Sequence, residues 1–407
     1  MSEHPPRNHA LPSPTSLTLP VVGAAALLGA LLLLLTGCGG GGGSDATATP
    51  APTPTPTPSP ETVQLTVDAS AGGFPPNAAI GFTYVNLVTG TTVALSDSEA
   101  AQSKDWHIAF RRTDIRLNGG VSGPLGVKGA IAVTPDGFYD AQGTPITSTF
   151  KDPNINAASM LAPFTGLSDA QVQTLSYKSD TYLPFIIGDG SALSWFAYDM
   201  QTHTLSANSD NWWLIRGAEG DSYARLHVIG LEQNAKQVSI EMYLQPKGSA
   251  AFEGGAETWV ADLGVSGTTR ACYDFETRAP IACETGSNWD LMVEIDGRSW
   301  NLWTNSGNVK GSGKGGAFGV LDASTAGSYG SAAGVPNFFA DSRGGVFADA
   351  TSTYNWALYS EQKMWPNYRV YAIDTAGNGR YALQILSYYH PGNGASGHYS
   401  IRFRKLP

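Results

Sequence analysis

Alternating apolar and polar residues dominate this chain, and this period-two pattern predicts β-strands. Val63, Leu65 and Val67 alternate near the start, and Tyr399, Ile401 and Phe403 alternate at the end. Short apolar segments rich in aromatic and β-branched residues lie between them, separated by turn-forming residues. The expected strands are 63–67, 82–88, 92–95, 106–110, 195–198, 212–215, 223–231 and 238–244, followed by 273–277, 289–295, 356–359, 368–373, 380–389 and 399–403.

A glycine-rich block occurs twice. Residues 118–133 read NGGVSGPLGVKGAIAV, and residues 305–320 read NSGNVKGSGKGGAFGV. Each block follows a tryptophan-led apolar segment. Aligned without a gap, Asn118, Gly120, Gly126, Gly129, Ala130 and Val133 coincide with Asn305, Gly307, Gly313, Gly316, Ala317 and Val320. So long a period predicts two copies of one domain, because solenoid repeats measure about 20–50 residues. Shared glycine offsets predict one loop geometry used twice.

The first 60 residues differ in composition from the rest. An apolar run at 19–35 precedes Cys38, which is typical of a lipoprotein signal peptide (1–37) whose cleavage leaves Cys38 lipidated. The alternative is an uncleaved membrane anchor, since the run approaches the ~18–20 residues that span a bilayer. Residues 38–60 continue with a glycine run and Thr-Pro repeats, which predict an extended linker. Gly39 after the cysteine resembles lipoproteins sent to the outer membrane.

The remaining residues fit two domains, 61–250 and 251–407, at about 100–200 residues each. They are rich in Gly, Thr, Ser, Tyr and Trp, which favours β structure. The formal net charge is −10 and there is no basic run, so the composition argues against a nucleic-acid partner. We find no GxSxG nucleophile motif, and GSGKGG at 311–316 does not follow a βα unit. The sequence therefore predicts a protein that is not an enzyme.

Three cysteines are present, and two remain if Cys38 is lipidated. Cys272 and Cys283 flank a segment with a turn near 278–280, which would place them opposite each other on two strands. In an oxidising envelope compartment this arrangement favours a disulfide. The alternative is two free buried thiols.

The tryptophan-led segment Trp106-His107-Ile108-Ala109-Phe110, then IRLNGG at 115–120 and the glycine-rich stretch, resembles the HmuY family of haem-binding envelope lipoproteins. RYALQILSYY at 380–389 is also similar to that family. The resemblance covers both copies. It implies an all-β fold of two tandem, mainly antiparallel HmuY-like domains. It also implies capture of haem, free or from a haem-carrying protein, for delivery to a TonB-dependent receptor at the outer membrane, with the domains periplasmic or cell-surface exposed.

Two aligned segments supply candidate iron ligands. WFAYDMQTH at 195–203 and WALYSEQKM at 356–364, aligned without a gap, place His203 on Met364. Histidine and methionine are common axial ligands of haem iron, and the resemblance implies ligands from this late part of each domain. The alternatives are a turn histidine at 203 and a packing methionine at 364. Possible second ligands are His227, Met200 and Met160 in the first copy, and Met292, His390 and His398 in the second. Candidates for pocket lining are Trp195, Tyr198, Trp356 and Tyr359.

A second hypothesis is a surface binding or adhesion module for glycan or protein. In it the tryptophans serve as stacking surfaces: Trp195, Trp212, Trp213, Trp356 and Trp365. His107, which aligns with Asp290, is interpreted as a satisfied strand-edge histidine. Asp290, Glu294 and Asp296 are interpreted as one solvated face of a strand rather than a calcium site.

Overall fold

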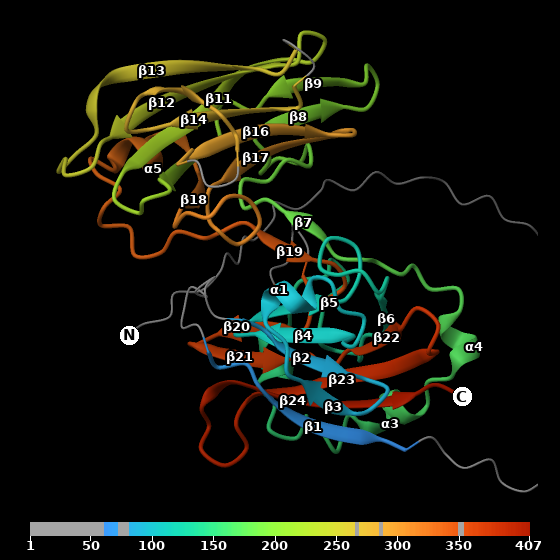
Figure 1. Ribbon diagram of the computed structural model, residues 1–407. Helices are drawn as coiled ribbons and strands as arrows, with labels where there is room; N and C mark the ends of the chain where they lie inside the picture. Colours follow the sequence, from blue (N-terminus) through green and yellow to red (C-terminus); the bar gives the residue numbers. More distant parts are fainter. Residues whose placement is uncertain (1–60, 72–80, 265–267, 285–287, 349–353) are drawn as a thin grey trace, which may run out of the picture. The chain divides into compact units, whose positions relative to one another are not determined.

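The computed structural model describes residues 61–71, 81–264, 268–284, 288–348 and 354–407 (Figure 1). These residues form 24 strands and five short helices, so the predicted all-β class is confirmed. The expected signal peptide, Cys38 and the linker 38–60 lie outside them. Within the described ranges, every helix is too short or too polar to cross a membrane.

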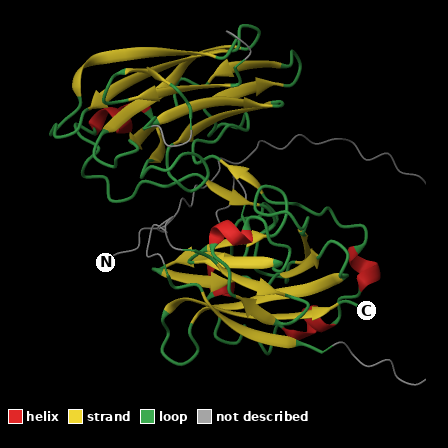
Figure 2. Ribbon diagram, viewed as in Figure 1, coloured by secondary structure: helices red, strands yellow, loops and turns green. Residues whose placement is uncertain are grey.

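Figure 2 shows that yellow strands predominate over short red helices in the described chain. The first repeat holds twelve strands and four helices within its described residues. In order they are β1 (Val63–Asp68), β2 (Thr83–Asn86), β3 (Thr91–Val93), α1 (Asp97–Ala100), β4 (Ile108–Arg111), β5 (Asp114–Leu117), β6 (Lys128–Val133), α2 (Thr147–Phe150), α3 (Leu161–Thr165), α4 (Asp169–Val172), β7 (Thr181–Leu183), β8 (Phe196–Asp199), β9 (Thr204–Ala207), β10 (Trp212–Arg216), β11 (Tyr223–Glu232) and β12 (Gln237–Gln245).

The second half holds twelve strands and one helix. They are β13 (Glu253–Asp262), β14 (Arg270–Asp274), β15 (Ala279–Ile281), β16 (Leu291–Asp296), β17 (Ser299–Thr304), β18 (Gly316–Leu321), α5 (Ala323–Ser328), β19 (Ser342–Gly344), β20 (Ala357–Ser360), β21 (Lys363–Pro366), β22 (Val370–Asp374), β23 (Arg380–Tyr389) and β24 (Ser396–Lys405).

The two halves repeat one another strand for strand, with β13 in the place of β1 and β24 in the place of β12. The sheet β3-β2-β4-β5 recurs as β15-β14-β16-β17, and the hairpin β8–β9 recurs as β20–β21. The run β10-β11-β12 recurs as β22-β23-β24. The repeat that the glycine block predicts therefore extends over the whole described chain.

Strands are exchanged between the repeats. One five-stranded sheet has the order β1-β24-β23-β22-β6, and the other has the order β13-β12-β11-β10-β18. Figure 1 shows the blue strand β1 beside the red strand β24, with Val63 opposite Phe403. Each sheet thus combines the early strands of one repeat with the late strands of the other. The boundary at residue 250 separates the two repeats along the chain. It does not separate the sheets, because each five-stranded sheet contains strands from both sides of this boundary.

We call the first lobe the part built from β1–β6 and β20–β24, and the second lobe the part built from β8–β18. Each lobe has its own hydrophobic core. In the first lobe, Phe110 of β4 packs against Tyr399 of β24, with ring centroids 4.8 Å apart. In the second lobe, Trp259 of β13 packs against Tyr273 of β14 at 5.2 Å. Burial of these side chains is the main favourable term in folding.

The chain passes between the lobes along β7 and β19, which pair antiparallel with Tyr182 opposite Arg343. A buried aspartate precedes each of these strands. Asp180 Oδ2 accepts a hydrogen bond from the Leu117 amide at 3.0 Å, and Asp341 Oδ2 accepts one from the Thr304 amide at 2.9 Å. Leu117 is the last residue of β5, and Thr304 is the last residue of β17. The segment before β7 is therefore hydrogen-bonded to β5 in the first lobe, and the segment before β19 is hydrogen-bonded to the equivalent strand β17 in the second lobe.

The glycine block keeps its predicted equivalence only in its first part. Gly120 and Gly307 both have positive φ, at 59° and 70°, so the shared loop geometry is confirmed there. A Cβ on Gly120 would lie 2.1 Å from the Asp180 carbonyl oxygen, which excludes any other residue. In the strands that follow, β6 pairs Gly129 with Ile373, whereas β18 pairs Ala317 with Ile215. The gapless alignment is therefore wrong by one residue in this part.

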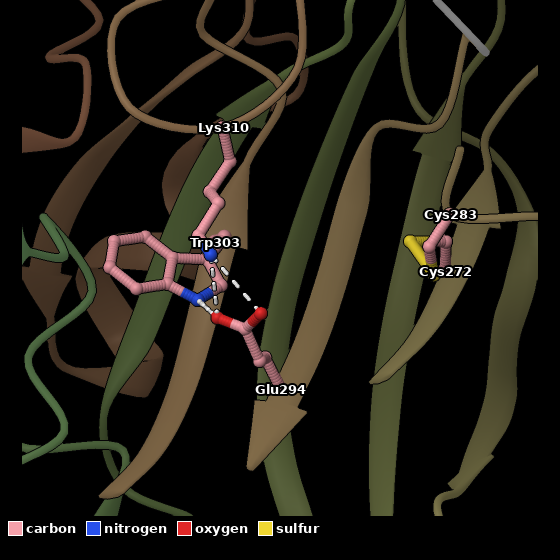
Figure 3. The surroundings of a disulfide bond; sticks show 5 residues. All are labelled: Cys272, Cys283, Glu294, Trp303 and Lys310. Atoms are coloured by element: carbon pink, nitrogen blue, oxygen red, sulfur yellow. Dashed lines mark hydrogen bonds and ion pairs between the residues drawn. A yellow bond between two sulfur atoms is a disulfide. The ribbon is translucent and has the colours of Figure 1, made fainter. Parts of the chain in front are cut away.

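Cys272 of β14 and Cys283, just beyond β15, form the predicted disulfide, with their Cα atoms 5.4 Å apart (Figure 3). The turn between the two strands contains Arg278, whose φ is positive at 53°. Pairing of Cys272 with Ile281 brings the two cysteines together, as the position of the turn predicts.

Candidate functional site

The β8–β9 hairpin brings together three of the predicted site residues. Tyr198 pairs with Leu205, and residues 200–203 form the connecting loop. The His203 backbone has positive φ, and its Nδ1 lies 2.6 Å from the Tyr198 hydroxyl oxygen. The Met200 side chain is 80% exposed and Tyr198 is 43% exposed. The loop therefore presents an imidazole, a thioether and a phenol to solvent.

The Tyr198–His203 contact determines what the imidazole can do. In the tautomer with the proton on Nδ1, His203 donates to the tyrosine oxygen and the Nε2 lone pair is free. A hydrogen bond at one ring nitrogen is the usual way in which proteins orient a metal-binding histidine and fix its tautomer. His203 thus has the geometry of an oriented metal ligand.

The equivalent β20–β21 hairpin has no such loop. Tyr359 pairs with Met364, and the connection is the two-residue turn Glu361–Gln362, where both residues have positive φ. The counterpart of Met364 is Leu205, not His203, so the gapless alignment of these two residues is wrong. Its cause is the first hairpin's longer loop, which adds two residues. Met364 is 4% exposed and packs in the first-lobe core, in agreement with the alternative of a packing residue.

The other candidate ligands of the first repeat are engaged elsewhere. His227 stacks on Trp212 with ring centroids 3.6 Å apart. Its Nδ1 lies 2.7 Å from the Ser209 carbonyl oxygen, and its Nε2 lies 3.2 Å from Glu241 Oε1. Met160 packs at the edge of an aromatic cluster in the first lobe. Neither residue joins His203.

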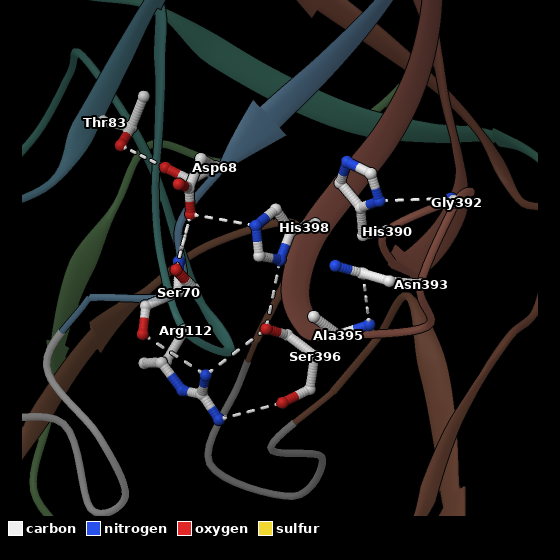
Figure 4. Close-up of polar contacts among 10 residues, drawn as sticks. All are labelled: Asp68, Ser70, Thr83, Arg112, His390, Gly392, Asn393, Ala395, Ser396 and His398. Atoms are coloured by element: carbon white, nitrogen blue, oxygen red, sulfur yellow. Dashed lines mark hydrogen bonds and ion pairs between the residues drawn. The ribbon is translucent and has the colours of Figure 1, made fainter.

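His390 and His398 form a pair at the β23–β24 connection, with ring centroids 5.2 Å apart and planes at 89° (Figure 4). His398 Nε2 lies 3.4 Å from Asp68 Oδ1. His390 Nδ1 accepts a hydrogen bond from the Gly392 amide at 3.1 Å, which leaves the proton of the neutral ring on Nε2. Iron binding at Nε2 would therefore require a change of tautomer and loss of that hydrogen bond. This pair is a poorer ligand set than His203.

Most of the predicted pocket residues belong to the cores. Trp195 and Trp356 are at most 1% exposed, as is Trp213, so they stabilise the lobes and are not stacking surfaces. Tyr359 packs against the first-lobe core. Tyr198 is the pocket candidate that stays on the surface. Met292 is 2% exposed and lies within the cluster around the disulfide.

His107 and Asp290 perform the same structural task in the two repeats. The ring nitrogen Nδ1 of His107 accepts the Leu87 amide at 3.2 Å, and Asp290 Oδ2 accepts the Phe275 amide at 2.6 Å. His107 is thus a buried structural histidine as interpreted, but it is satisfied only at Nδ1, because its buried Nε2 has no partner among the described residues. Burial lowers the pKa of its imidazole.

Asp290 is fully buried, so its assignment to a solvated face is wrong. Its side chain accepts hydrogen bonds from the Phe275 and Ala218 amides and lies close to Glu219 and Glu276. Burial raises the pKa of Asp290 to about 8, and repulsion from the two glutamates adds to this. Glu294 is mostly buried too and pairs with Lys310 at 2.9 Å, whereas Asp296 is exposed. These carboxyl groups support local structure.

The described residues thus form a two-lobed β-sheet protein that presents an imidazole and a thioether on an exposed hairpin loop. The HmuY protein family model matches residues 80–245, so this stretch of the chain is similar to the HmuY family. The match runs from β2 to β12, which is one repeat in chain order although its strands lie in both lobes. No curated protein matches the chain.

Proposed function

We propose that this protein is a non-enzymatic haem-binding lipoprotein that takes up haem at the β8–β9 hairpin, with His203 as an axial ligand. The arrangement of Tyr198 and His203 supports this most directly, because the 2.6 Å contact orients the imidazole, and the tautomer in which Nδ1 donates to the tyrosine oxygen leaves the Nε2 lone pair for iron. Exposed Met200 lies in the same loop and supplies either a second ligand or apolar contact with the porphyrin. Similarity to the HmuY family supports the choice of haem.

The proposal gives the repeats unequal roles. The second lobe carries the four-residue loop with His203, whereas the first lobe has a two-residue turn in its place. One haem per chain is therefore expected. The first lobe then has a structural role, because it combines strands of both repeats, and it is not a second haem site.

We further propose attachment to the outer membrane through a lipid on Cys38, with residues 39–60 as the tether. The Thr-Pro repeats support this, because such sequences are extended spacers. A TonB-dependent receptor would be the recipient of the haem. Palmitate labelling of the wild-type chain and of Cys38→Ala tests the anchor, and an equal label in both would contradict it.

A haemin titration of the full chain in mild detergent tests the haem site, with Soret absorbance recorded in the oxidised and reduced states. The wild type should show a saturable shift at one equivalent. His203→Ala should weaken binding by at least tenfold, and Tyr198→Phe by about tenfold, the lower end of the range for removing a ligand-orienting hydrogen bond.

The matched control is His398→Ala, which removes a histidine from the pair in the first lobe. Its titration should equal that of the wild type. A Soret shift that survives in His203→Ala and is lost in His398→Ala would move the site to the β23–β24 connection. Absence of a shift in every chain would overturn the haem function.

A further inference from the structure

A small cavity lies beside the β4–β5 hairpin of the first lobe, and Gly307 and Asn308 of the β17–β18 loop line it from the second lobe. Its volume is about 120 Å³, below the ~300–1,000 Å³ of clefts that enclose drug-sized ligands. Three arginines line it: Arg111, Arg116 and Arg343. So many guanidinium groups around so small a space are unusual, because charged side chains are seldom buried unless they are paired.

Strand alternation places two of these arginines on one face. Arg111 of β4 pairs with Asp114 of β5, and Ala109 pairs with Arg116. All four side chains thus lie on the face opposite Phe110, whose side chain packs in the main core of the first lobe. Ala109 packs on that opposite face in a smaller cluster with Phe82. Arg343 reaches the same cavity from β19, so the crossing segment completes the wall.

An aromatic ring lies beneath two of the guanidinium groups. The Arg111 and Arg116 guanidinium carbons lie 4.4 and 4.0 Å from the Phe82 ring centroid. Arginine is well suited to such stacking, and the ring holds both planar groups in place. Arg111 is 3% exposed and Arg116 is 8% exposed, so both positive charges are largely removed from water.

The acidic partners at the cavity are fewer than the arginines. Asp114 Oδ2 accepts from Arg116 Nη2 at 2.9 Å and lies 3.5 Å from Arg111 Nη2. Asp97 Oδ1 accepts from the Phe82 amide and, at 2.6 Å, from the Tyr84 hydroxyl. Asp180 acts on Arg343 electrostatically, but its Oδ2 accepts the Leu117 amide. Asp114 is therefore the carboxylate that pairs with the arginines at close range.

Several guanidinium donors have weak partners or none. Asn308 Oδ1, a neutral acceptor, receives Arg111 Nη2 at 2.9 Å and Arg116 Nη2 at 3.3 Å. Within the described chain, the buried Nε atoms of Arg111, Arg116 and Arg343 have no acceptor. A buried donor without an acceptor is unfavourable, so these Nε–H groups favour an added acceptor in the cavity.

We propose that this cavity binds a small oxyanion, a carboxylate or a phosphate group, held by Arg111, Arg116 and Arg343. The planar fork of arginine matches the oxygens of either group and forms charge-assisted, often bidentate hydrogen bonds. The bound anion would supply both the missing charge and the missing acceptors. Its site is distant in sequence from the β8–β9 hairpin and does not depend on haem binding.

The protonation behaviour of the arginines agrees with this assignment. Burial lowers the pKa of Arg343, and repulsion from Arg116 lowers it further. Burial is also the main cause of the lowered pKa of Arg111. Both effects describe positive charge held away from water with too little compensation, which a bound anion would relieve.

Calorimetric titration of the full chain in mild detergent at low ionic strength tests the site, with inorganic phosphate and acetate as separate probes. We expect saturable binding of at least one probe. Binding of phosphate alone would identify a phosphate group as the ligand, and binding of acetate alone a carboxylate. Arg343→Gln should raise Kd by about tenfold or more, as expected for loss of a hydrogen bond to a charged group.

Arg343→Lys keeps the charge without the fork and should lie between the wild type and Arg343→Gln. Lys310→Gln is the control, because it removes a cation from the Glu294–Trp303 cluster, which occupies the equivalent region of the other repeat. His203→Ala should leave anion binding unchanged, which separates this site from the haem site. The proposal is overturned if neither probe binds saturably. It is also overturned if folded Arg343→Gln and Arg116→Gln chains bind the probe as tightly as the wild type does.

Discussion

The arginine cavity of the first lobe and its counterpart in the second lobe share one backbone frame but have opposite contents. Arg111 and Arg116 are replaced at the equivalent positions of β16 and β17 by Glu294 and Trp303. Trp303 Nε1 donates to Glu294 Oε2 at 3.0 Å, and Lys310 Nζ lies 2.9 Å from the same carboxylate (Figure 3).

The counterpart is filled with apolar and self-paired groups. Tyr182, which replaces Arg343, meets Trp303 edge to face at 6.0 Å. The Cys272–Cys283 disulfide packs in the same cluster. One repeat thus balances its charges internally, while the other leaves positive charge uncompensated. The shared backbone arrangement determines where a cavity can form. The side chains at the equivalent positions determine whether that cavity is filled.

The largest effect is expected from the disulfide, which has no equivalent in the first lobe. Cys272→Ser with Cys283→Ser should lower the free energy of unfolding by about 3 kcal/mol. Without the disulfide, the loop between the two residues gains conformational entropy in the unfolded chain. Denaturant titration of the full chain measures this loss. Tyr84→Phe at the equivalent first-lobe position is the control and should cost about 1 kcal/mol, for one hydrogen bond to Asp97. Equal losses in the two variants would contradict the comparison.

The buried aspartates of the two crossing segments should behave alike. Burial raises the pKa of Asp180 to about 7 and that of Asp341 to about 6. The native state then holds protons that the unfolded state releases near pH 4, so stability is greatest at low pH and falls as pH rises through these values.

Asp180→Asn should remove part of that fall, on the order of 2 kcal/mol between pH 5 and pH 8. Thermal unfolding across this pH range, with the exposed Asp136→Asn as control, measures the difference. A steeper fall in Asp180→Asn than in the wild type would reverse the assigned sign.

The smallest effect is expected at the ion pair. Lys310→Met should lower the free energy of unfolding by about 1 kcal/mol, because the pair is partly solvated and Trp303 still donates to Glu294. Double-mutant analysis with Glu294→Gln isolates the coupling. A coupling free energy near zero would show that the ion pair does not stabilise this region and that the apolar cluster around Trp303 does so alone.

Much of the fold was predictable from the chain. Alternation located β1 and β24 and identified their buried faces, and the glycine block revealed the repeat. The partnership of β1 with β24 was not predictable, because β12 and β24 present similar alternating faces. Alternation specifies which side of a strand is buried, but it does not specify which copy supplies the neighbour.

The candidate site was predictable only in part. His203 and Tyr198 were recognised as residue types suited to iron, yet their hydrogen bond depends on the turn between them. A two-residue difference in loop length moved Met364 out of register, and a gapless comparison cannot detect such a change. The arginine cavity was missed because its residues come from β4, β5 and β19, and Arg343 lies 227 positions after Arg116 in the sequence.

The pairing of β1 with β24 also bears on the order of folding during synthesis. The strands of the second lobe, β8–β18, are contiguous, so this lobe can form while the ribosome is still making the end of the chain. The first lobe must wait, because its opening strand needs one of the last strands made. Its unpaired early strands would be the aggregation-prone part of the nascent protein. A truncated chain that lacks β22–β24 should therefore retain a folded middle between two unfolded ends.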